Sequence, residues 1–247
     1  MAVQQEGRRV TGPSLLYRSS VPVTDDISVV IPKVGDVIDR EDEYYTQVSI
    51  LTAMPMDYML QLDELGLDVS EVTDYELFLM LFDTMKDMKT DLIFGDLDIS
   101  RFERSYHIET GAPVLYDEEN DIVIDRVAYT KIASFLRQLH HLEKNNRKPA
   151  NGEAKKFLLD RARKKAERNR RKKKESQIEP LIIAMVNTEQ FKYGYEETRG
   201  LSIYQFNESV RQILHKVDYD NKMHGIYAGT IDPKRLSQDD LNWVRHK

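Results

Sequence analysis

The chain has 247 residues, of which 40% are hydrophobic and 32% charged, and its net charge at pH 7 is −6. It contains no cysteine, which excludes disulfides and thiolate metal sites and fits a reducing compartment. No apolar run approaches the roughly 20 residues that span a bilayer, and the first 18 residues lack the apolar stretch of a secretory signal. We therefore expect a soluble, intracellular protein.

The charge is distributed unevenly along the chain. Residues 144–175 contain 15 Lys and Arg against four Asp and Glu, a net charge of +11 that leaves −17 for the remainder. We expect an α+β fold that is mostly α-helical, with one cationic helix between two acidic bodies. The expected parts are a mobile N-terminal arm (1–26), a mainly helical acidic domain with a β-hairpin (27–143), a basic helix or linker (144–178) and a small helical C-terminal domain (179–247).

The acidic domain begins with a short strand and two helices. The β-branched run Ile27–Ile31 predicts a strand that Pro32 ends. Apolar residues at mixed helical spacing predict a helix over residues 44–54. Asp74 is a suitable N-cap for a helix that is apolar over most of its circumference, so this helix should lie centrally in the core.

The second half of this domain contains the residue patterns that predict a β-hairpin. Residues 92–97 indicate a strand or tight turn, and Phe102 and Tyr106 indicate a short helix. Apolar runs at 114–116 and 122–124 flank a charged loop and predict a β-hairpin. Asp125 can then cap a helix from Arg126 to about Glu143, with Val127, Ile132, Phe135, Leu136 and Leu139 on its apolar face.

The basic segment favours helix over residues 153–175, because Ala, Leu, Lys, Arg and Glu dominate it. Only its first turns have an apolar face, from Phe157, Leu158 and Leu159, so the rest must be solvated or matched by acidic surface. We interpret Phe157 as a packing residue, which leaves nucleic-acid binding as an alternative without aromatic support. The candidate contacts to a partner or to nucleic acid are Lys155, Lys156, Arg161, Arg163, Lys164, Lys165, Arg168, Arg170, Arg171 and Lys172.

The C-terminal part reads as several short helices. Residues 181–186 form an apolar helix or strand, and Ser202 can cap a strong helix over residues 203–217. A further helical segment is expected over 219–228. Ser237 with Asp240 resembles a capping box that would start a last helix at Leu241.

The sequence contains no residue pattern that identifies a reaction or a cofactor. Adjacent His140 and His141 point to different sides of a helix, and neither has a second histidine four residues on, so we do not expect a metal site there. The acidic loop 117–121 lacks the glycine and the spacing of a calcium loop. Without a nucleophile–base pair or a phosphate-binding glycine loop, we expect a binding protein, not an enzyme, and no cofactor.

Several segments resemble virion-associated proteins of phages that infect Gram-positive bacteria. They are residues 95–98, 120–126, 179–193, 198–210, 223–232 and 241–243, and the resemblance extends from about Val37 onward. It implies a role in tail or virion morphogenesis, with the tail assembly chaperones as the nearest class, and it implies no catalytic residues. The implied partners are tail tube protein, tape-measure protein or neighbouring virion subunits, in the host cytoplasm during assembly or in the virion.

A chaperone of this kind would hold partners through mobile arms and amphipathic helices. The N-terminal arm and the helix after Ser202 are the candidates, with Tyr204, Phe206, Val210 and Trp243 as the expected partner contacts. Two alternatives remain: a permanent structural component of the tail, neck or baseplate, and a nucleic-acid-binding protein that uses residues 153–175. Homo-oligomers are compatible with each of them.

Overall fold

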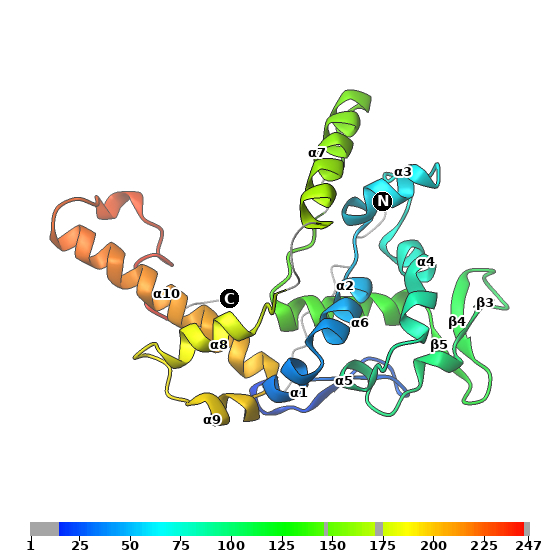
Figure 1. Ribbon diagram of the computed structural model, residues 1–247, viewed down its shortest axis with the longest axis horizontal. Helices are drawn as coiled ribbons and strands as arrows, with labels where there is room; N and C mark the ends of the chain where they lie inside the picture. Colours follow the sequence, from blue (N-terminus) through cyan, green and yellow to red (C-terminus); the bar gives the residue numbers. More distant parts are fainter. Residues whose placement is uncertain (1–14, 146–147, 171–174, 245–247) are drawn as a thin grey trace. The chain divides into compact units, whose positions relative to one another are not determined.

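A computed structural model of the protein describes residues 15–145, 148–170 and 175–244. Contacts between Cα atoms divide the chain into two compact units, shown in Figure 1. Unit 1 consists of the chain up to Pro32 together with Asp39–Glu175, and unit 2 consists of Lys33–Ile38 and Ser176–Lys247. The fold is mostly helical with two small antiparallel sheets, which confirms the predicted fold class.

Unit 1 contains the sheets and most of the hydrophobic core. Its elements are the 3-10 helix η1 (Leu15–Tyr17), β1 (Ser20–Pro22), β2 (Ser28–Val30), α2 (Glu41–Leu51), η2 (Pro55–Tyr58), α3 (Met59–Glu64), α4 (Asp74–Lys86), α5 (Asp91–Phe94), η3 (Ile99–Arg101), β3 (Glu103–Tyr106), β4 (Pro113–Asp117), β5 (Ile122–Ile124), α6 (Arg126–His140) and α7 (Gly152–Arg170).

Helix α4 lies in the core, as its apolar circumference predicts. Phe78 on α4 stacks on Tyr129 of α6 with ring centroids 4.7 Å apart. The Tyr75 hydroxyl donates a hydrogen bond to the carbonyl of Ile124, 2.9 Å away, and so connects α4 to β5. The first turn begins one residue earlier than predicted, because Thr73 is the N-cap and forms a capping box with Glu76, while Asp74 is the first helical residue.

The predicted hairpin is present, but it is part of a larger sheet. Strands β4 and β5 pair antiparallel, with Leu115 opposite Ile124. A third strand, β3, pairs with the other edge of β4, so the short helix expected around Phe102 and Tyr106 is wrong. The segment consists mainly of charged and polar residues (Glu103, Arg104 and Ser105) and has little apolar signal, so backbone pairing to β4 decides its conformation.

Residues 15–26 do not belong to the mobile arm that was predicted for residues 1–26. Residues 1–14 lie outside the described part of the chain, but β1 pairs antiparallel with β2, with Val21 opposite Val29. Val21 and Val23 are buried, and the Val23 carbonyl accepts a hydrogen bond from Lys131 Nζ at 3.1 Å. Residues 15–26 are therefore packed into unit 1, because two valines and a leucine (Val21, Val23 and Leu15) give this polar stretch a small apolar face.

Three other predictions in unit 1 need correction. Residues 91–94 form the short helix α5 and not a strand, and Gly95 turns the chain with a positive φ of 61°. Val127 is exposed, although the cap at Asp125 and the rest of the α6 apolar face are confirmed. Helix α6 ends at His140, before the predicted Glu143, and His141 adopts the left-handed conformation.

Unit 2 is helical and is completed by a segment from far earlier in the chain. Its elements are α1 (Val34–Asp39), α8 (Glu179–Val186), α9 (Tyr195–Gly200), α10 (Ile203–Tyr227) and η4 (Pro233–Arg235). The amide of Val34 donates to the carbonyl of Leu201 at 2.9 Å, and Lys33 forms a β-bridge with Ser202. Val34 and Val37 are fully buried, as are Ile203 and Phe206.

The structure changes the helix boundaries expected in unit 2. Residues 181–186 are helical, and Ser202 caps α10 through a capping box with Gln205. Helix α10 continues without a break to Tyr227, so the separate segment expected over 219–228 belongs to it. Ser237 and Asp240 form the hydrogen bonds of a capping box, but no helix follows them in residues 241–244.

Gly35 allows α1 to lie close to α9. A Cβ atom built on Gly35 would lie 3.2 Å from the backbone oxygen of Arg199, which cannot move without shifting α9. We expect Gly35→Val to lower the free energy of unfolding of unit 2 by about 1–3 kcal/mol through overpacking. Chemical denaturation followed by the fluorescence of Trp243, the sole tryptophan, measures this change.

The matched control is Gly200→Val, because nothing lies within 4 Å of a Cβ atom at that position. Equal destabilisation by both substitutions would contradict the close approach of α1 to α9.

A partly buried histidine links α2 to α6. His140 Nε2 lies 2.8 Å from the hydroxyl of Tyr44, and the rings of Tyr44 and Tyr45 pack around it. Burial lowers the pKa of His140 to about 4 and raises the pKa of Tyr44 well above its usual value of 10. The neutral imidazole is therefore suited to accept a hydrogen bond that the Tyr44 hydroxyl donates.

Folded His140 binds a proton only near pH 4, whereas the unfolded chain binds it near pH 6.5. Stability is therefore lost as pH falls from about 6.5 towards 4. Between pH 7 and pH 5 we expect unit 1 to lose about 2 kcal/mol through this residue. We expect His140→Gln to abolish the loss of stability that protonation of His140 causes. Chemical denaturation of the variant and the unaltered chain, followed by circular dichroism at pH 7 and at pH 5, measures this difference. An unchanged pH dependence in the variant would contradict the neutral state of His140.

Candidate interaction surfaces

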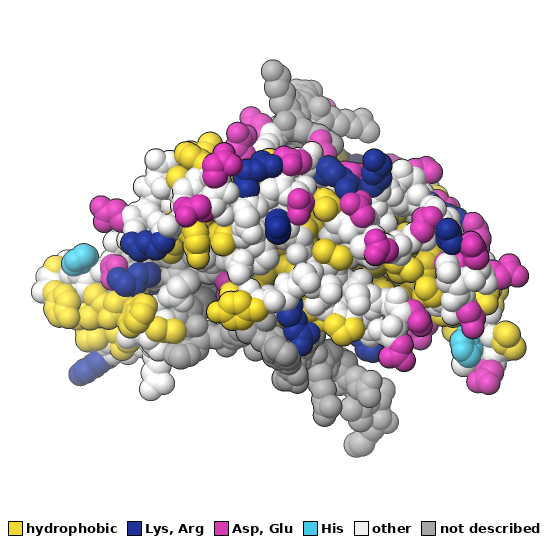
Figure 2. All heavy atoms as spheres, turned by 90° about the horizontal axis from the view of Figure 1, so that it is seen from below, with side chains coloured by type: hydrophobic (Ala, Val, Ile, Leu, Met, Phe, Trp, Pro, Cys, Tyr) yellow, Lys and Arg dark blue, Asp and Glu magenta, His cyan; other side chains and the backbone are white. Residues whose placement is uncertain are grey.

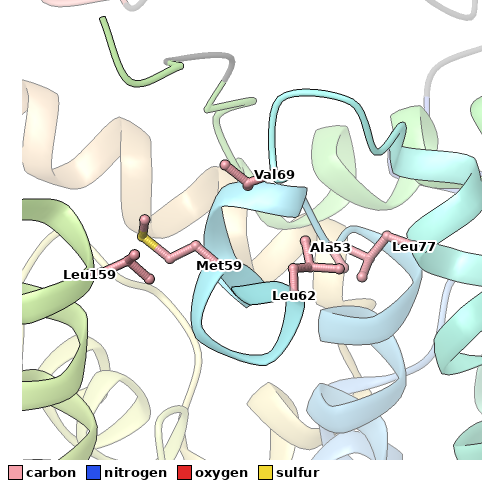
Figure 3. Close-up of a cluster of buried hydrophobic side chains, with 6 residues drawn as sticks. All are labelled: Ala53, Met59, Leu62, Val69, Leu77 and Leu159. Carbon is pink, nitrogen blue, oxygen red and sulfur yellow. The ribbon is translucent and has the colours of Figure 1, made fainter. Parts of the chain in front are cut away.

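Helix α7 is anchored to α3 by its N-terminal half. Leu159 is 6% exposed and enters a cluster of buried side chains from α3 and the segments around it, drawn in Figure 3. The other members are Ala53, Met59, Leu62, Val69 and Leu77. Leu158 and Ala162 pack on the same cluster, so one side of α7 faces α3.

Two ion pairs flank this apolar contact. Lys155 Nζ lies 3.1 Å from Asp68 Oδ2, and Arg163 Nη2 lies 3.4 Å from Asp63 Oδ2. A hydrogen bond from the backbone of Ser70, assisted by Lys155, holds the pKa of Asp68 below its usual range. Solvent-exposed pairs of this kind contribute about 0–1 kcal/mol, whereas burial of one leucine contributes about 1.5–3 kcal/mol. The leucine therefore anchors the helix, and the ion pairs fix its rotation.

The other side of α7 carries cations with no ion-pair partner in the described part of the chain. Arg161, Lys164, Lys165 and Arg168 are exposed, and we call these four residues the cationic stripe. They lie within about 100° of the helix circumference, at 100° per residue. Lys156 is also exposed, but it is separated from the stripe by Glu153 and Asp160 on the helix surface. Of the remaining predicted contacts, Arg163 pairs with Asp63 of α3, and Lys155 pairs with Asp68 in the loop that follows α3. Arg171, Lys172 and the side chain of Arg170 lie outside the described atoms.

Phe157 does not pack, contrary to the prediction. Its side chain is 67% exposed, because Leu158 and Leu159 take the side facing α3 and leave Phe157 on the opposite side. Phe157 lies four residues before Arg161, one helical turn away and on the same face. The exposed aromatic ring therefore continues the line of the cationic stripe.

An acidic line borders the stripe on one side. Glu153, Asp160 and Glu167 recur every seven residues and are all exposed. Asp160 Oδ1 lies 3.6 Å from Arg163 Nη1, so this line faces the edge of α7 that meets α3. Helix α7 thus sorts its exposed charges into an acidic edge and a cationic face.

Helix α10 in unit 2 is buried only at its start. Ile203, Tyr204 and Phe206 are its buried residues, and all three lie in its first turn or just after it. Beyond them, Val210, Ile213, Leu214 and Val217 continue the same face at spacings of three and four residues, and we call these four the apolar stripe. Leu214 is 62% exposed and Val217 is 40% exposed. Figure 2 shows hydrophobic side chains gathered at the left, where Figure 1 places the outer part of α10.

The C-terminal segment covers the opposite face of α10. Gln212 Nε2 donates to the carbonyl of Trp243 at 2.8 Å, and the His215 ring lies 2.7 Å from the carbonyl of Asn242. Lys222 Nζ pairs with Asp240 at 2.6 Å and holds the pKa of that carboxyl far below its usual range. The positions 212, 215 and 222 lie on the side of the helix away from Val210 and Val217, so this segment leaves the apolar stripe uncovered.

The predicted partner contacts in unit 2 divide into buried and accessible residues. Tyr204 and Phe206 are 5% and 0% exposed, so they are core residues and their prediction as partner contacts is wrong. Val210 is half-buried at the start of the apolar stripe, and Trp243 is 55% exposed. Leu214 and Val217 are not among the predicted partner contacts, although their spacing after Phe206 is the signal that identifies the exposed stripe.

One hollow lies on the surface of unit 1. It has a volume of about 320 Å³ and is lined by Arg101, Glu103, Arg104, Ser105, Tyr116, Asp117, Glu118 and Glu119. Its arginines are engaged by Glu119 at 2.8 Å and by Asp83 at 3.0 Å.

Within residues 15–145, 148–170 and 175–244, no group of three or more His, Cys, Asp or Glu side chains is arranged to hold a metal ion. In the same residues, no helix combines the length and apolar character needed to cross a membrane.

Comparison with known proteins identifies a relationship for the C-terminal part. Residues 170–246 match the family model described as the YomV second domain. The match covers almost all of the C-terminal segment of unit 2 and includes α8, α9 and α10. No curated protein and no solved structure matches the chain. The matching family derives from Bacillus phage, which agrees with the resemblance of the sequence to phage proteins and indicates a phage protein.

Proposed function

We propose that the protein binds other phage proteins during virion morphogenesis, in the manner of a tail assembly chaperone, and that it performs no catalysis. The observation that carries this proposal is the apolar stripe of α10, which lies inside the segment that matches the phage domain family. The proposed partners are the tail tube and tape-measure proteins of the same phage.

The stripe has the character of a helix that docks on another polypeptide. Its side chains continue the line of Ile203 and Phe206, which are fully buried in unit 2. A partner helix or groove placed on Leu214 and Val217 would therefore extend an existing core. Recognition of this kind uses apolar anchors that recur every three or four residues, which is the spacing of the stripe.

The size of the stripe favours a transient contact. Stable interfaces bury about 800 Å² on each partner. Four side chains, two of which are already half-buried, can supply only a fraction of that area. A chaperone must release its partner when the tail assembles, so a small apolar contact suits it better than it suits a permanent virion subunit.

Substitution of the stripe tests the proposal. We expect Leu214→Glu with Val217→Glu to reduce co-purification with tail tube or tape-measure protein at least tenfold, because a partner would have to bury two carboxylates. Both side chains are exposed, so unit 2 should remain folded. The measurement is quantitative pull-down of the co-expressed proteins by the full chain.

The matched control is Tyr106→Glu with Ile108→Glu, which replaces two exposed apolar side chains of unit 1. This control should leave co-purification unchanged. If both double variants bind equally well, the stripe is not the docking surface. Mass spectrometry of purified virions separates the remaining alternative: absence of the protein supports a chaperone, whereas stoichiometric presence would establish a structural component.

A further inference from the structure

We propose that the cationic stripe of α7 and the adjacent Phe157 bind single-stranded nucleic acid. This site is separate from the apolar stripe of α10 and goes beyond the proposed chaperone function. It consists of Arg161, Lys164, Lys165 and Arg168, preceded by the exposed ring of Phe157.

The first argument is the difference between the two sides of α7. Towards α3, Lys155 and Arg163 are neutralised by Asp68 and Asp63. On the opposite side, the stripe cations have no ion-pair partner among the described residues, although the chain outside the basic block carries a net charge of −17. These cations are therefore available to an external polyanion. Because α7 is packed against α3, they all lie on one surface of the protein.

The second argument is the composition of this face. The centres of protein–protein interfaces are depleted of charged residues and contain several apolar side chains. The α7 face has four cations and one aromatic ring, which is the combination that proteins use to follow a single strand: cations contact the phosphates, and a base stacks on the ring. An acidic polypeptide would satisfy the cations but would give Phe157 no planar partner.

The third argument is geometric and favours a single strand over a duplex. Phe157 and Arg168 are separated by about 16 Å along the helix, at 1.5 Å per residue. A flexible strand can follow this narrow line and turn one base onto the ring, whereas the bases of a duplex are already stacked on one another. The acidic line of Glu153, Asp160 and Glu167 borders the stripe on the Lys164 side. A strand should therefore pass on the Arg161, Lys165 and Arg168 side.

The negative charge of the rest of the protein does not prevent local binding. At physiological ionic strength, charges more than about 8 Å apart in solvent are largely screened from each other. Binding should consequently be moderate in affinity and strongly dependent on salt. Release of counterions from about four phosphates gives a slope near −3 in log K against log salt, or a roughly 50-fold loss of affinity between 50 and 200 mM salt.

Fluorescence anisotropy with the full chain tests the site. The probes are labelled 20-nucleotide oligo-dT and oligo-U, which distinguish DNA from RNA. We expect Arg161→Glu, Lys165→Glu and Arg168→Glu together to weaken binding at least tenfold at 50 mM salt. The control Lys192→Glu, Lys234→Glu and Arg235→Glu makes the same change in net charge on exposed residues of unit 2 and should leave binding unchanged. Equal losses in the two triple variants would overturn the site.

Phe157→Ala tests the stacking contact separately. We expect it to weaken binding of oligo-dT about 5- to 150-fold, because stacking of one base is worth about 1–3 kcal/mol. Binding of an abasic oligonucleotide with the same number of phosphates should not change. Circular dichroism confirms that each variant keeps its helix content. If Phe157→Ala weakened binding of the abasic oligonucleotide as much as binding of oligo-dT, the ring would act only by supporting the fold. That result would overturn the stacking role.

Two further probes complete the test. Poly-L-glutamate of matched charge and a 20-base-pair duplex should each bind at least tenfold more weakly than oligo-dT. Equal binding of poly-L-glutamate would assign the surface to an acidic protein, and equal binding of the duplex would contradict single-strand selectivity. Absence of oligonucleotide binding at 50 mM salt overturns this inference and leaves the α10 proposal unaffected.

Discussion

The position of the basic helix α7 in unit 1 depends on one contact, that of Leu159 with the cluster of buried side chains around α3. Without it, residues 152–170 would be a highly charged helix with no preferred orientation. In proteins most of the stability of a helix comes from tertiary packing, so we expect this contact to supply much of the stability of α7. One buried leucine, with two flanking ion pairs, decides which charges of the helix face the protein and which face solvent.

The same arrangement occurs in unit 2 with different chemistry. The first turn of α10 is held in the core by Ile203 and Phe206, and the helix then continues past that core. In α7 the free face is cationic, whereas in α10 it is apolar. Each unit thus presents a helix that is anchored in its N-terminal half and keeps one face open to solvent. A helix of this kind is rigid, which lowers the conformational entropy that a partner must overcome on binding.

The two free faces suit different partners because their chemistry differs. An apolar stripe gains affinity by excluding water and depends little on salt, whereas a cationic stripe gains affinity by displacing counterions and depends strongly on salt. The family match covers the C-terminal part of the chain and therefore bears on α10, but it includes only the last residue of α7. The proposals for the two helices accordingly stand on separate observations.

Periodicity in the sequence was sufficient to predict most of the helices and the hairpin. The apolar spacing in α4, α6 and α10, together with caps such as Asp125 and Ser202, is a local signal that tertiary structure preserves. Errors such as the helix expected in place of β3 came from contacts with other segments of the chain. Neither the docking of α1 beside α9 nor the pairing of β3 with β4 leaves a trace in the local pattern.

The candidate sites were only partly predictable for the same reason. The basic block identified the cations of α7, but the choice between Phe157 and Leu159 as the buried residue required the position of α3. Similarly, the apolar face of α10 was evident, but Tyr204 and Phe206 could be separated from Leu214 and Val217 only by knowing where the core of unit 2 ends. Burial depends on what packs against a helix, which its own sequence does not specify.

Hydrogen exchange along α7 in the full chain measures the anchoring of this helix most directly. If Leu159 holds the helix on α3, the backbone amides of residues 157–163 should exchange at least tenfold more slowly than those of residues 166–170, because the former open only when the packed cluster is broken. Uniformly fast exchange over the whole of α7 would show that the helix is not anchored, and would contradict both the orientation of its charges and the site built on them.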